Sequence, residues 1–112
     1  MRITVVGTGY VGLVVGAGLA EHGNDVVCVD IDPEKVRALQ QGKIPIFEPG
    51  LEELVKRNRS EKRLSFTLEL TTAIRRSEIV FIAVSTPENA SGDADIGQVY
   101  AAARDIGRAI AG

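Results

Sequence analysis

Hydrophobic and polar residues follow two alternating patterns along this chain, and together they predict strands that alternate with helices. Short apolar runs rich in β-branched residues are typical of buried strands. The candidate strands are 3–6, 26–29, 64–67 and 79–84. Segments with apolar residues at helical spacing lie near 12–22, 32–42, 51–58, 70–74 and 96–110. This order predicts an α/β fold with a parallel, doubly wound sheet and the spatial strand order 3-2-1-4.

Two of these segments carry further detail. The run 79–84 is apolar throughout, which predicts a strand buried on both faces and placed beside the first strand. The last predicted helix carries an apolar stripe at helical spacing. The stripe consists of Ile96, Val99, Tyr100, Ala103, Ile106 and Ile110.

The first strand runs into a glycine-rich turn, Gly7-x-Gly9-x-x-Gly12, that opens the first helix. Strand, turn and helix are the context that a dinucleotide-binding fingerprint requires. Gly7 allows a tight turn, Gly9 leaves room for a pyrophosphate to approach the backbone, and Gly12 allows close packing of helix and strand. The N-terminus of the helix then offers free N–H groups to phosphates.

The first helix contains more glycine than helix propensity favours. Gly12, Gly16 and Ala20 recur every four residues and therefore share one face. An interior glycine costs about 1 kcal/mol relative to alanine. Gly16 and Gly18 therefore predict a helix pressed closely against the sheet.

The second strand ends in a carboxylate, Asp30, about 20 residues beyond the glycines. A carboxylate at that position accepts hydrogen bonds from the adenosine ribose and repels the 2′-phosphate of NADP, which favours NAD. The alternative is a glycine-rich strand–helix–strand unit that binds no ligand.

Two further positions allow two interpretations each. Lys35 follows Asp32 and Pro33, which predict the start of the second helix. It is either a solvated lysine or a donor to the ribose or a phosphate. Thr86 follows the fourth strand, at the sheet edge where such folds bind ligands. It is either a second cofactor contact or a turn residue before Pro87.

The composition is that of an ordinary globular domain, with 45% hydrophobic and 25% charged residues. A formal net charge of -2 argues against a nucleic-acid-binding surface, and we interpret the basic run 56–63 as a solvated helix end.

Cys28, the single cysteine, cannot form an internal disulfide, which fits a cytoplasmic protein, and we expect it in the core. Glycines interrupt the uncharged segment 3–20, so we expect neither a signal peptide nor a membrane span. We expect no metal site.

Four segments together resemble the N-terminal NAD-binding domain of the UDP-glucose 6-dehydrogenase family. They are 7–13 (Gly-Thr-Gly-Tyr-Val-Gly-Leu), 29–32 (Val-Asp-Ile-Asp), 42–51 (Gly-Lys-Ile-Pro-Ile-Phe-Glu-Pro-Gly-Leu) and 85–87 (Ser-Thr-Pro). The resemblance extends over essentially the whole chain and implies a Rossmann-type domain. GDP-mannose and UDP-N-acetylmannosamine dehydrogenases share much of this pattern, so they remain alternatives.

The resemblance also implies roles for individual positions. It assigns the backbone of Tyr10 and Val11 to the pyrophosphate and Asp30 to the adenosine ribose. Lys35 and Thr86 fall on positions that contact the cofactor in the family. Ser85 stands where the family has glycine before Thr-Pro, which concerns how closely the backbone approaches NAD there.

The family oxidises the primary alcohol of a nucleotide sugar to a carboxylate with two NAD. Its catalytic cysteine lies well downstream of the matched region, and Cys28 does not correspond to it. At 112 residues, the chain is expected to be one domain, 1–112, without the central helix and the UDP-sugar domain. We therefore expect no catalytic residue here, a UDP-sugar substrate only in the full-length parent, and a homo-oligomeric parent.

The remaining alternatives are another nicotinamide dehydrogenase, which the 44–51 stretch disfavours, and a non-enzymatic NAD-binding module.

Overall fold

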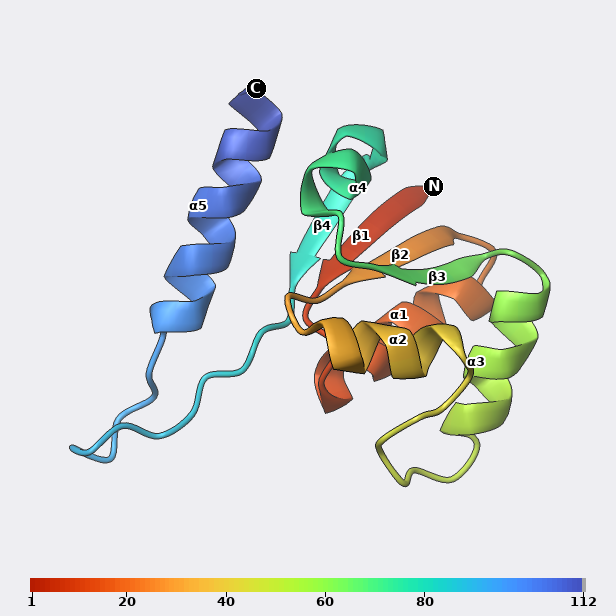
Figure 1. Ribbon diagram of the computed structural model, residues 1–112, viewed down its shortest axis with the longest axis horizontal. Coiled ribbons are helices and arrows are strands. Elements are labelled where there is room, and N and C mark those ends of the chain that lie inside the picture. Colours follow the sequence, from red (N-terminus) through yellow and green to blue (C-terminus); the bar gives the residue numbers. More distant parts are fainter. Residues whose placement is uncertain (112) are drawn as a thin grey trace.

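The chain forms one four-stranded parallel sheet with helices on both faces, and the computed structural model describes residues 1–111 (Figure 1). The strands are β1 (Arg2–Val6), β2 (Asp25–Val29), β3 (Leu64–Thr67) and β4 (Ile79–Ile82). Their spatial order is β3-β2-β1-β4, which confirms the predicted order. Val6 pairs with both Val29 and Ile82, so β1, β2 and β4 end at the same level.

Five helices connect and follow the strands. They are α1 (Tyr10–Glu21), α2 (Pro33–Gln40), α3 (Leu51–Ser60), α4 (Leu70–Arg76) and α5 (Gly97–Ala111). The N-terminus of α2 has the predicted cap, because a carboxylate oxygen of Asp32 accepts from the backbone N–H of Glu34 at 3.0 Å. Pro33 occupies the first helical position, where its missing N–H costs nothing.

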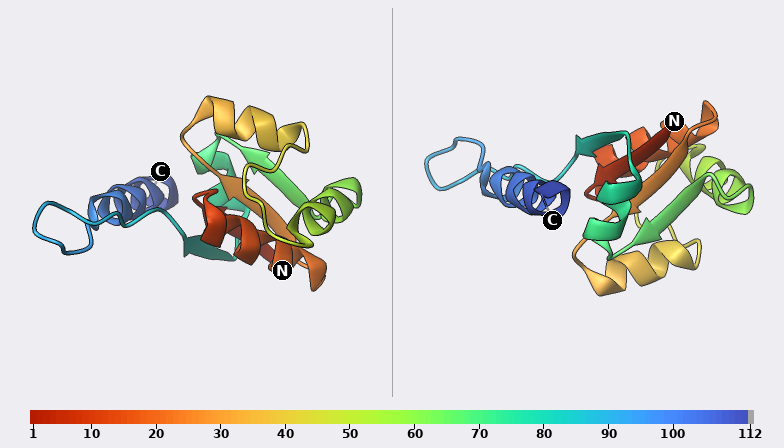
Figure 2. Two further views of the ribbon diagram at one scale, coloured as in Figure 1. Left: turned by 90° about the horizontal axis from the view of Figure 1, so that it is seen from below. Right: turned by 90° about the horizontal axis from the view of Figure 1, so that it is seen from above.

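Successive residues of β1 point to opposite faces and divide the core in two. Ile3 and Val5 belong to the cluster that includes α1, α2 and α3, whereas Val6 belongs to the cluster of α4 and α5. The second cluster is small, and it lies at the β4 end of the sheet. Figures 1 and 2 show α5 beside α4 and β4, at the end of the sheet opposite α3.

Strand β4 is less buried than predicted. Ile79, Phe81 and Ile82 are each about 40% exposed. The strand pairs only with β1 among the described residues, so it forms a sheet edge. The prediction of burial on both faces was wrong because an apolar run reports the composition of a strand and not the neighbours that cover it.

The last helix exists as predicted, and its buried face overlaps the apolar stripe only in part. Its buried residues are Ala102, Ile106 and Ala109, whereas Tyr100 is 69% and Ile110 is 71% exposed. Small side chains suit the contact with α4, because they let the two helices approach closely. Ile96, Tyr100 and Ile110 of the predicted stripe are therefore exposed, whereas Ile106 is buried.

The close packing predicted for α1 holds at Gly16 and not at Gly18. A Cβ on Gly16 would lie 2.7 Å from the sulfur of Cys28 on β2, whereas a Cβ on Gly18 would meet no atom within 4 Å. Gly16 faces the sheet, and the prediction for Gly18 was wrong because it sits two residues further around the helix, away from β2.

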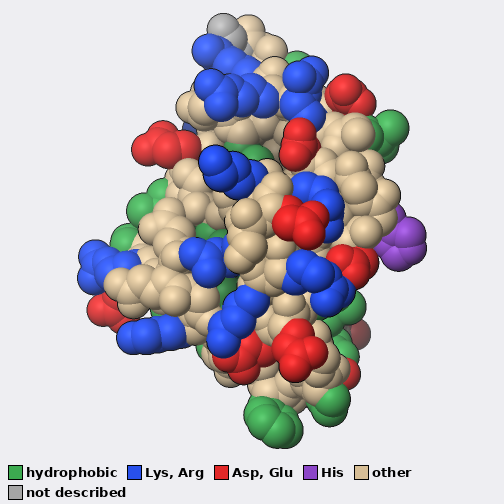
Figure 3. Space-filling model, turned by 90° about the vertical axis from the view of Figure 1, so that its right-hand side faces the viewer, with side chains coloured by type: hydrophobic (Ala, Val, Ile, Leu, Met, Phe, Trp, Pro, Cys, Tyr) green, Lys and Arg blue, Asp and Glu red, His purple; other side chains and the backbone are tan. Residues whose placement is uncertain are grey.

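The basic run 56–63 lies on a surface where acidic and basic side chains alternate (Figure 3). Asn58 is an exception within the run, because its side chain is fully buried. Its amide donates to the Leu54 carbonyl at 2.8 Å, and its oxygen accepts from Arg63 at 2.9 Å and 3.1 Å. Arg57 forms an ion pair with Glu21 of α1. The segment is therefore partly a polar joint between α1, α3 and β3.

The segment 3–20 forms β1 and most of α1. Among residues 1–111, no helix has both the length and the apolar character that a membrane span requires.

Candidate dinucleotide-binding site

The carboxyl ends of β1 and β2 are joined at Gly7, where the glycine-rich turn begins. The Gly7 N–H donates to the Val29 carbonyl at 2.7 Å, and its φ of 109° lies in a region that favours glycine. A Cβ on Gly7 would lie 2.6 Å from the carbonyl oxygen of Ala83, just beyond β4. The turn is thus enclosed by backbone on both sides, and it excludes any side chain at this position.

Gly12 and Gly9 differ in what surrounds them. A Cβ on Gly12 would lie 1.9 Å from the carbonyl oxygen of Gly7, so α1 can start against the turn only with glycine there. Gly9 is exposed, and a Cβ on it would meet nothing within 4 Å. The protein therefore leaves open space beside Gly9, between two glycines, Gly7 and Gly12, that backbone atoms closely surround.

The first turn of α1 borders this open space. Gly9 is the N-cap residue and provides no side-chain hydrogen bond to the helix. Tyr10 and Val11 follow it, and their side chains are 51% and 59% exposed. The N–H groups at a helix N-terminus point out of the helix and carry a partial positive charge, which suits a phosphate oxygen.

Asp30 lies directly beside the turn. Its Oδ2 accepts from the backbone N–H of Thr8 at 3.0 Å and from the Thr8 hydroxyl at 2.6 Å, and its Oδ1 accepts from the Asp32 N–H at 3.1 Å. Partial burial raises the pKa of this carboxyl, but the hydrogen bonds from Thr8 and Asp32, with the charge of Lys35, lower it by more. The pKa of Asp30 therefore lies below its ordinary value, and the group is ionised at neutral pH.

Thr8 is the residue that the sequence interpretation missed. It lies at the variable position between Gly7 and Gly9, and only 1% of its surface is exposed. The strand register contained the signal, because Val6 pairs with Val29 and the residues just beyond them must be neighbours. A hydroxyl residue at that level is within reach of a carboxylate that ends the adjacent strand.

Lys35 and Thr86 stand differently toward this site. Lys35 lies in the first turn of α2, half-buried, and its charge acts on Asp30. Thr86 is exposed in the loop that follows β4, at the same edge of the sheet. The atoms of this loop that approach Gly7 belong to Ala83 and Val84. The geometry thus brings Lys35 toward Asp30, and it places Thr86 at the same edge of the sheet as the glycine turn.

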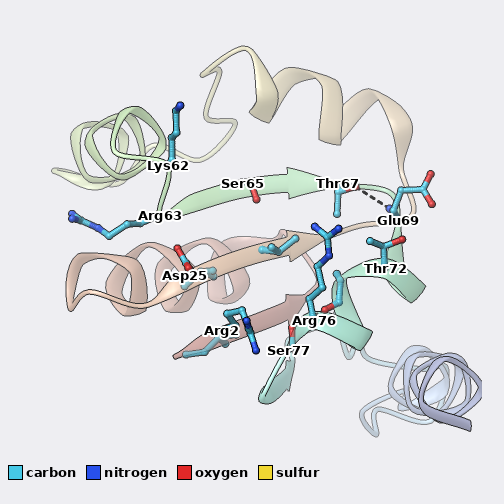
Figure 4. A pocket seen from close by; sticks show the side chains of 14 residues that line it. Arg2, Asp25, Lys62, Arg63, Ser65, Thr67, Glu69, Thr72, Arg76 and Ser77 are labelled. Atoms are coloured by element: carbon cyan, nitrogen blue, oxygen red, sulfur yellow. Dashed lines mark hydrogen bonds between the residues drawn. The ribbon is translucent and has the colours of Figure 1, made fainter.

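A separate groove of about 370 Å³ lies on the face of the sheet that carries α4, over β1, β2 and β3 (Figure 4). Arg2, Asp25, Ser65, Thr72 and Arg76 are among the residues that line it. None of the eight residues that the sequence proposes for the cofactor lines this groove. The glycine turn and Asp30, at the carboxyl edge of the sheet, therefore lie apart from this groove.

Comparisons with known proteins agree with this geometry. The sequence profile of the "UDP-glucose/GDP-mannose dehydrogenase family, NAD binding domain" matches residues 1–112. The chain is 53% identical to UDP-glucose 6-dehydrogenase TuaD of Bacillus subtilis over 111 residues, which are 99% of this chain and 24% of that protein. It is 56% identical to UDP-glucose 6-dehydrogenase of Rhizobium meliloti over 107 residues, which are 95% of this chain and 24% of that protein.

Solved structures give the same result. A ternary complex of GDP-mannose dehydrogenase from Pseudomonas aeruginosa superposes with a TM-score of 0.94 at 43% identity, covering 98% of this chain and 25% of that one. A UDP-glucose dehydrogenase from Pyrobaculum islandicum superposes with a TM-score of 0.91 at 44% identity, covering 96% and 25%. The chain spans about a quarter of the length of these relatives.

Proposed function

This chain belongs to the UDP-glucose/GDP-mannose dehydrogenase family, as its NAD-binding domain, and from that premise we propose which residues hold NAD and what enzyme the domain serves. The observation that carries the assignment is the link between the open turn and the acid. Gly9 faces free space, and the residue before it, Thr8, is hydrogen-bonded to Asp30. The proposed pyrophosphate position, Gly9, and the proposed ribose acceptor, Asp30, are thus linked through one residue, Thr8.

The proposed binding mode uses the backbone for the phosphates. The pyrophosphate would lie on Gly9 and on the N–H groups of Tyr10 and Val11, while Gly7 and Gly12 keep the turn and the helix in place. Backbone N–H groups suit this role because they are fixed before the ligand arrives and need no side chain to be ordered.

Asp30 would hold the adenosine ribose. The hydrogen bonds that lower its pKa keep it charged, and a charged acceptor makes stronger hydrogen bonds than a neutral one. The same charge repels the 2′-phosphate of NADP. Lys35 would add a donor on the ribose side and Thr86 a contact from the opposite side of the cofactor, which supports NAD in an extended pose across the sheet edge.

The enzyme that we propose for the parent protein is a UDP-glucose 6-dehydrogenase. Two of the relatives above carry that name and are more than half identical to this chain. A GDP-mannose 6-dehydrogenase of Pseudomonas aeruginosa is 43% identical, so GDP-mannose is the second candidate. NAD supplies the chemistry by accepting a hydride from the sugar alcohol.

The catalytic groups would come from the rest of the parent protein. Cys28 is buried beneath α1, and burial raises its pKa to about 12, so it does not suit the role of the family's catalytic cysteine. We propose residues 1–112 as the N-terminal part of a cofactor domain in a cytoplasmic, homo-oligomeric enzyme. In this role the chain binds NAD and does not oxidise the sugar by itself.

Calorimetric titration of the chain with NAD and with NADP tests the proposal. We expect NAD to bind more tightly, and Asp30→Ala to weaken NAD binding by about 1.5–3 kcal/mol per ribose hydrogen bond lost and to reduce discrimination against NADP. Glu34→Ala is the matched control, since it removes an exposed acid from the neighbouring first turn of α2. Unchanged affinity in Asp30→Ala would mean that the acid is wrongly assigned. Reduction of NAD by the chain with UDP-glucose present would contradict the division of roles.

A further inference from the structure

The glycine turn contains one buried side chain, that of Thr8, and this side chain is directed at the acid. Both donors of Thr8, its backbone N–H and its hydroxyl, converge on the same oxygen, Oδ2 of Asp30, at 3.0 Å and 2.6 Å. Only 1% of the surface of Thr8 is exposed, so water cannot take the place of its hydroxyl as the donor to Asp30. The turn therefore has no side chain at Gly9, where a ligand would approach, and it has the Thr8 side chain where it contacts Asp30.

The two oxygens of Asp30 differ in the protein donors that they accept. Oδ2 accepts two bonds from Thr8, while Oδ1 accepts one bond, from the Asp32 N–H at 3.1 Å. A carboxylate offers about four acceptor positions, so three are in use and the free one is on Oδ1. A ribose hydroxyl that donates to this free position would therefore displace no protein donor.

We infer that Thr8 is a positioning residue for the acid: its hydroxyl fixes Oδ2 of Asp30 against the turn and leaves Oδ1 as the oxygen that receives the ribose. The inference rests on the proposed function of the site and adds a residue to it. Without the hydroxyl, one N–H would remain on Oδ2, and the carboxylate would turn more freely about its side-chain bonds.

The surroundings of Asp30 supply few other restraints. The charged groups near it are Lys35 and Asp32, both at the start of α2, and the Asp32 side chain caps that helix. Thr67, at the end of β3, accepts the Asp30 backbone N–H at 3.3 Å and carries no charge. Thr8 is thus the only one of these neighbours whose side chain holds the carboxylate by a hydrogen bond.

Three substitutions separate the hydroxyl from the shape of the side chain. Thr8→Val keeps the branched shape and removes the hydroxyl, Thr8→Ser keeps the hydroxyl, and Thr8→Ala removes it without adding an apolar branch. Titrations of NAD and NADP should show at least tenfold weaker NAD binding and a smaller preference for NAD in Thr8→Val. Thr8→Ser should bind like the wild type. Thr8→Ala serves in place of Thr8→Val if circular dichroism shows that the valine variant is unfolded.

A second measurement does not depend on the ligand. Carbon-detected NMR titration of the Asp30 carboxyl in the free protein should show a higher pKa in Thr8→Val than in the wild type and in Thr8→Ser. In the Asp30→Ala background, Thr8→Val should leave NAD affinity unchanged, because the carboxylate that Thr8 positions is then absent.

The outcomes distinguish the two proposals. If the wild type binds no NAD while Thr8→Val raises the Asp30 pKa, the proposed function fails and the hydrogen-bonded positioning stands. If the wild type binds NAD and Thr8→Val binds it equally well with the same preference over NADP, the positioning role is overturned. A loss of affinity that Thr8→Ser does not restore would also overturn it, since shape and not the hydroxyl would then be responsible.

Discussion

A side-chain carbon on Gly12 would lie 1.9 Å from the carbonyl oxygen of Gly7, so the first turn of α1 is in contact with the end of β1. The backbone fixes the position of this carbon, and the oxygen is itself a backbone atom, so no change of rotamer relieves the overlap. Gly9, between them in the sequence, has no such neighbour within 4 Å. The three glycines of one motif therefore divide into two that build the turn and one that keeps it open.

We predict opposite phenotypes for alanine at Gly12 and at Gly9. Gly12→Ala should lower the free energy of unfolding by about 3 kcal/mol or more, because α1 must move away from the turn. Gly9→Ala should change it by less than about 1 kcal/mol, since its φ of -75° suits alanine, but it should weaken NAD binding at the open surface. Urea denaturation and NAD titration measure both effects. Full NAD affinity in Gly9→Ala would show that the pyrophosphate lies elsewhere.

A second pair of glycines tests how closely α1 packs on the sheet. Gly16→Ala should destabilise the protein by about 1–3 kcal/mol, because the new Cβ would lie 2.7 Å from the Cys28 sulfur. Gly18→Ala should stabilise it by about 0.5–1 kcal/mol, since the position is open and alanine favours the helix. Thermal unfolding of both variants checks the signs.

The double variant Gly16→Ala with Cys28→Ala identifies the cause. Removing the sulfur makes room for the new methyl group, so the two changes together should cost at least about 0.5 kcal/mol less than their sum. Strict additivity would mean that Gly16 is required for a reason other than contact with Cys28.

The sequence predicted the parallel sheet and its strand order because hydrophobic periodicity and right-handed crossovers restrict the topology strongly. It also predicted that the glycine turn and Asp30 would lie together, since both end adjacent parallel strands. It did not predict the hydrogen bonds from Thr8 to Asp30, because a threonine in a turn carries no signal until the register with β2 is known. Asn58 was missed for a similar reason: its hydrogen-bond partners Glu21, on α1, and Arg63, in the turn before β3, are not adjacent to it in the sequence.

The burial of β4 and α5 was beyond the reach of pattern reasoning. Phe81 is apolar and lies in a strand, yet it is 40% exposed, because burial depends on the layers above and beside a strand. Tyr100 belongs to a regular apolar stripe, yet it is exposed. Helix α5 instead buries Ala102 and Ala109, because α4 approaches closely there. Periodicity identifies an amphipathic helix, but the shape of the neighbouring helix decides which residues fill the contact.

We predict that the single thiol is unreactive until the protein unfolds. Burial raises the pKa of Cys28 from its ordinary value of 9.0 to about 12, and the thiolate is the reactive form. A disulfide reagent at mildly alkaline pH should therefore label native protein only at the rate at which it opens, and unfolded protein at once. Labelling of native protein as fast as a free thiol would show that β2 and α1 separate readily.

The last prediction concerns acid stability and Asp30. Its pKa is lower in the folded protein than in the unfolded chain, so its hydrogen bonds stabilise the fold fully above the unfolded pKa. This contribution is lost as the pH falls through the lower, folded pKa, where Thr8 and Asp32 face a neutral acid. Asp30→Asn lacks this titration, so the stability advantage of the wild type should shrink as urea denaturation is repeated from neutral to acidic pH. Glu21, whose pKa is also lowered, chiefly by its hydrogen bond from Arg57, is present in both proteins and cancels in the difference. An advantage that stays constant across the acid range would mean that Asp30 gains nothing from being ionised in the fold.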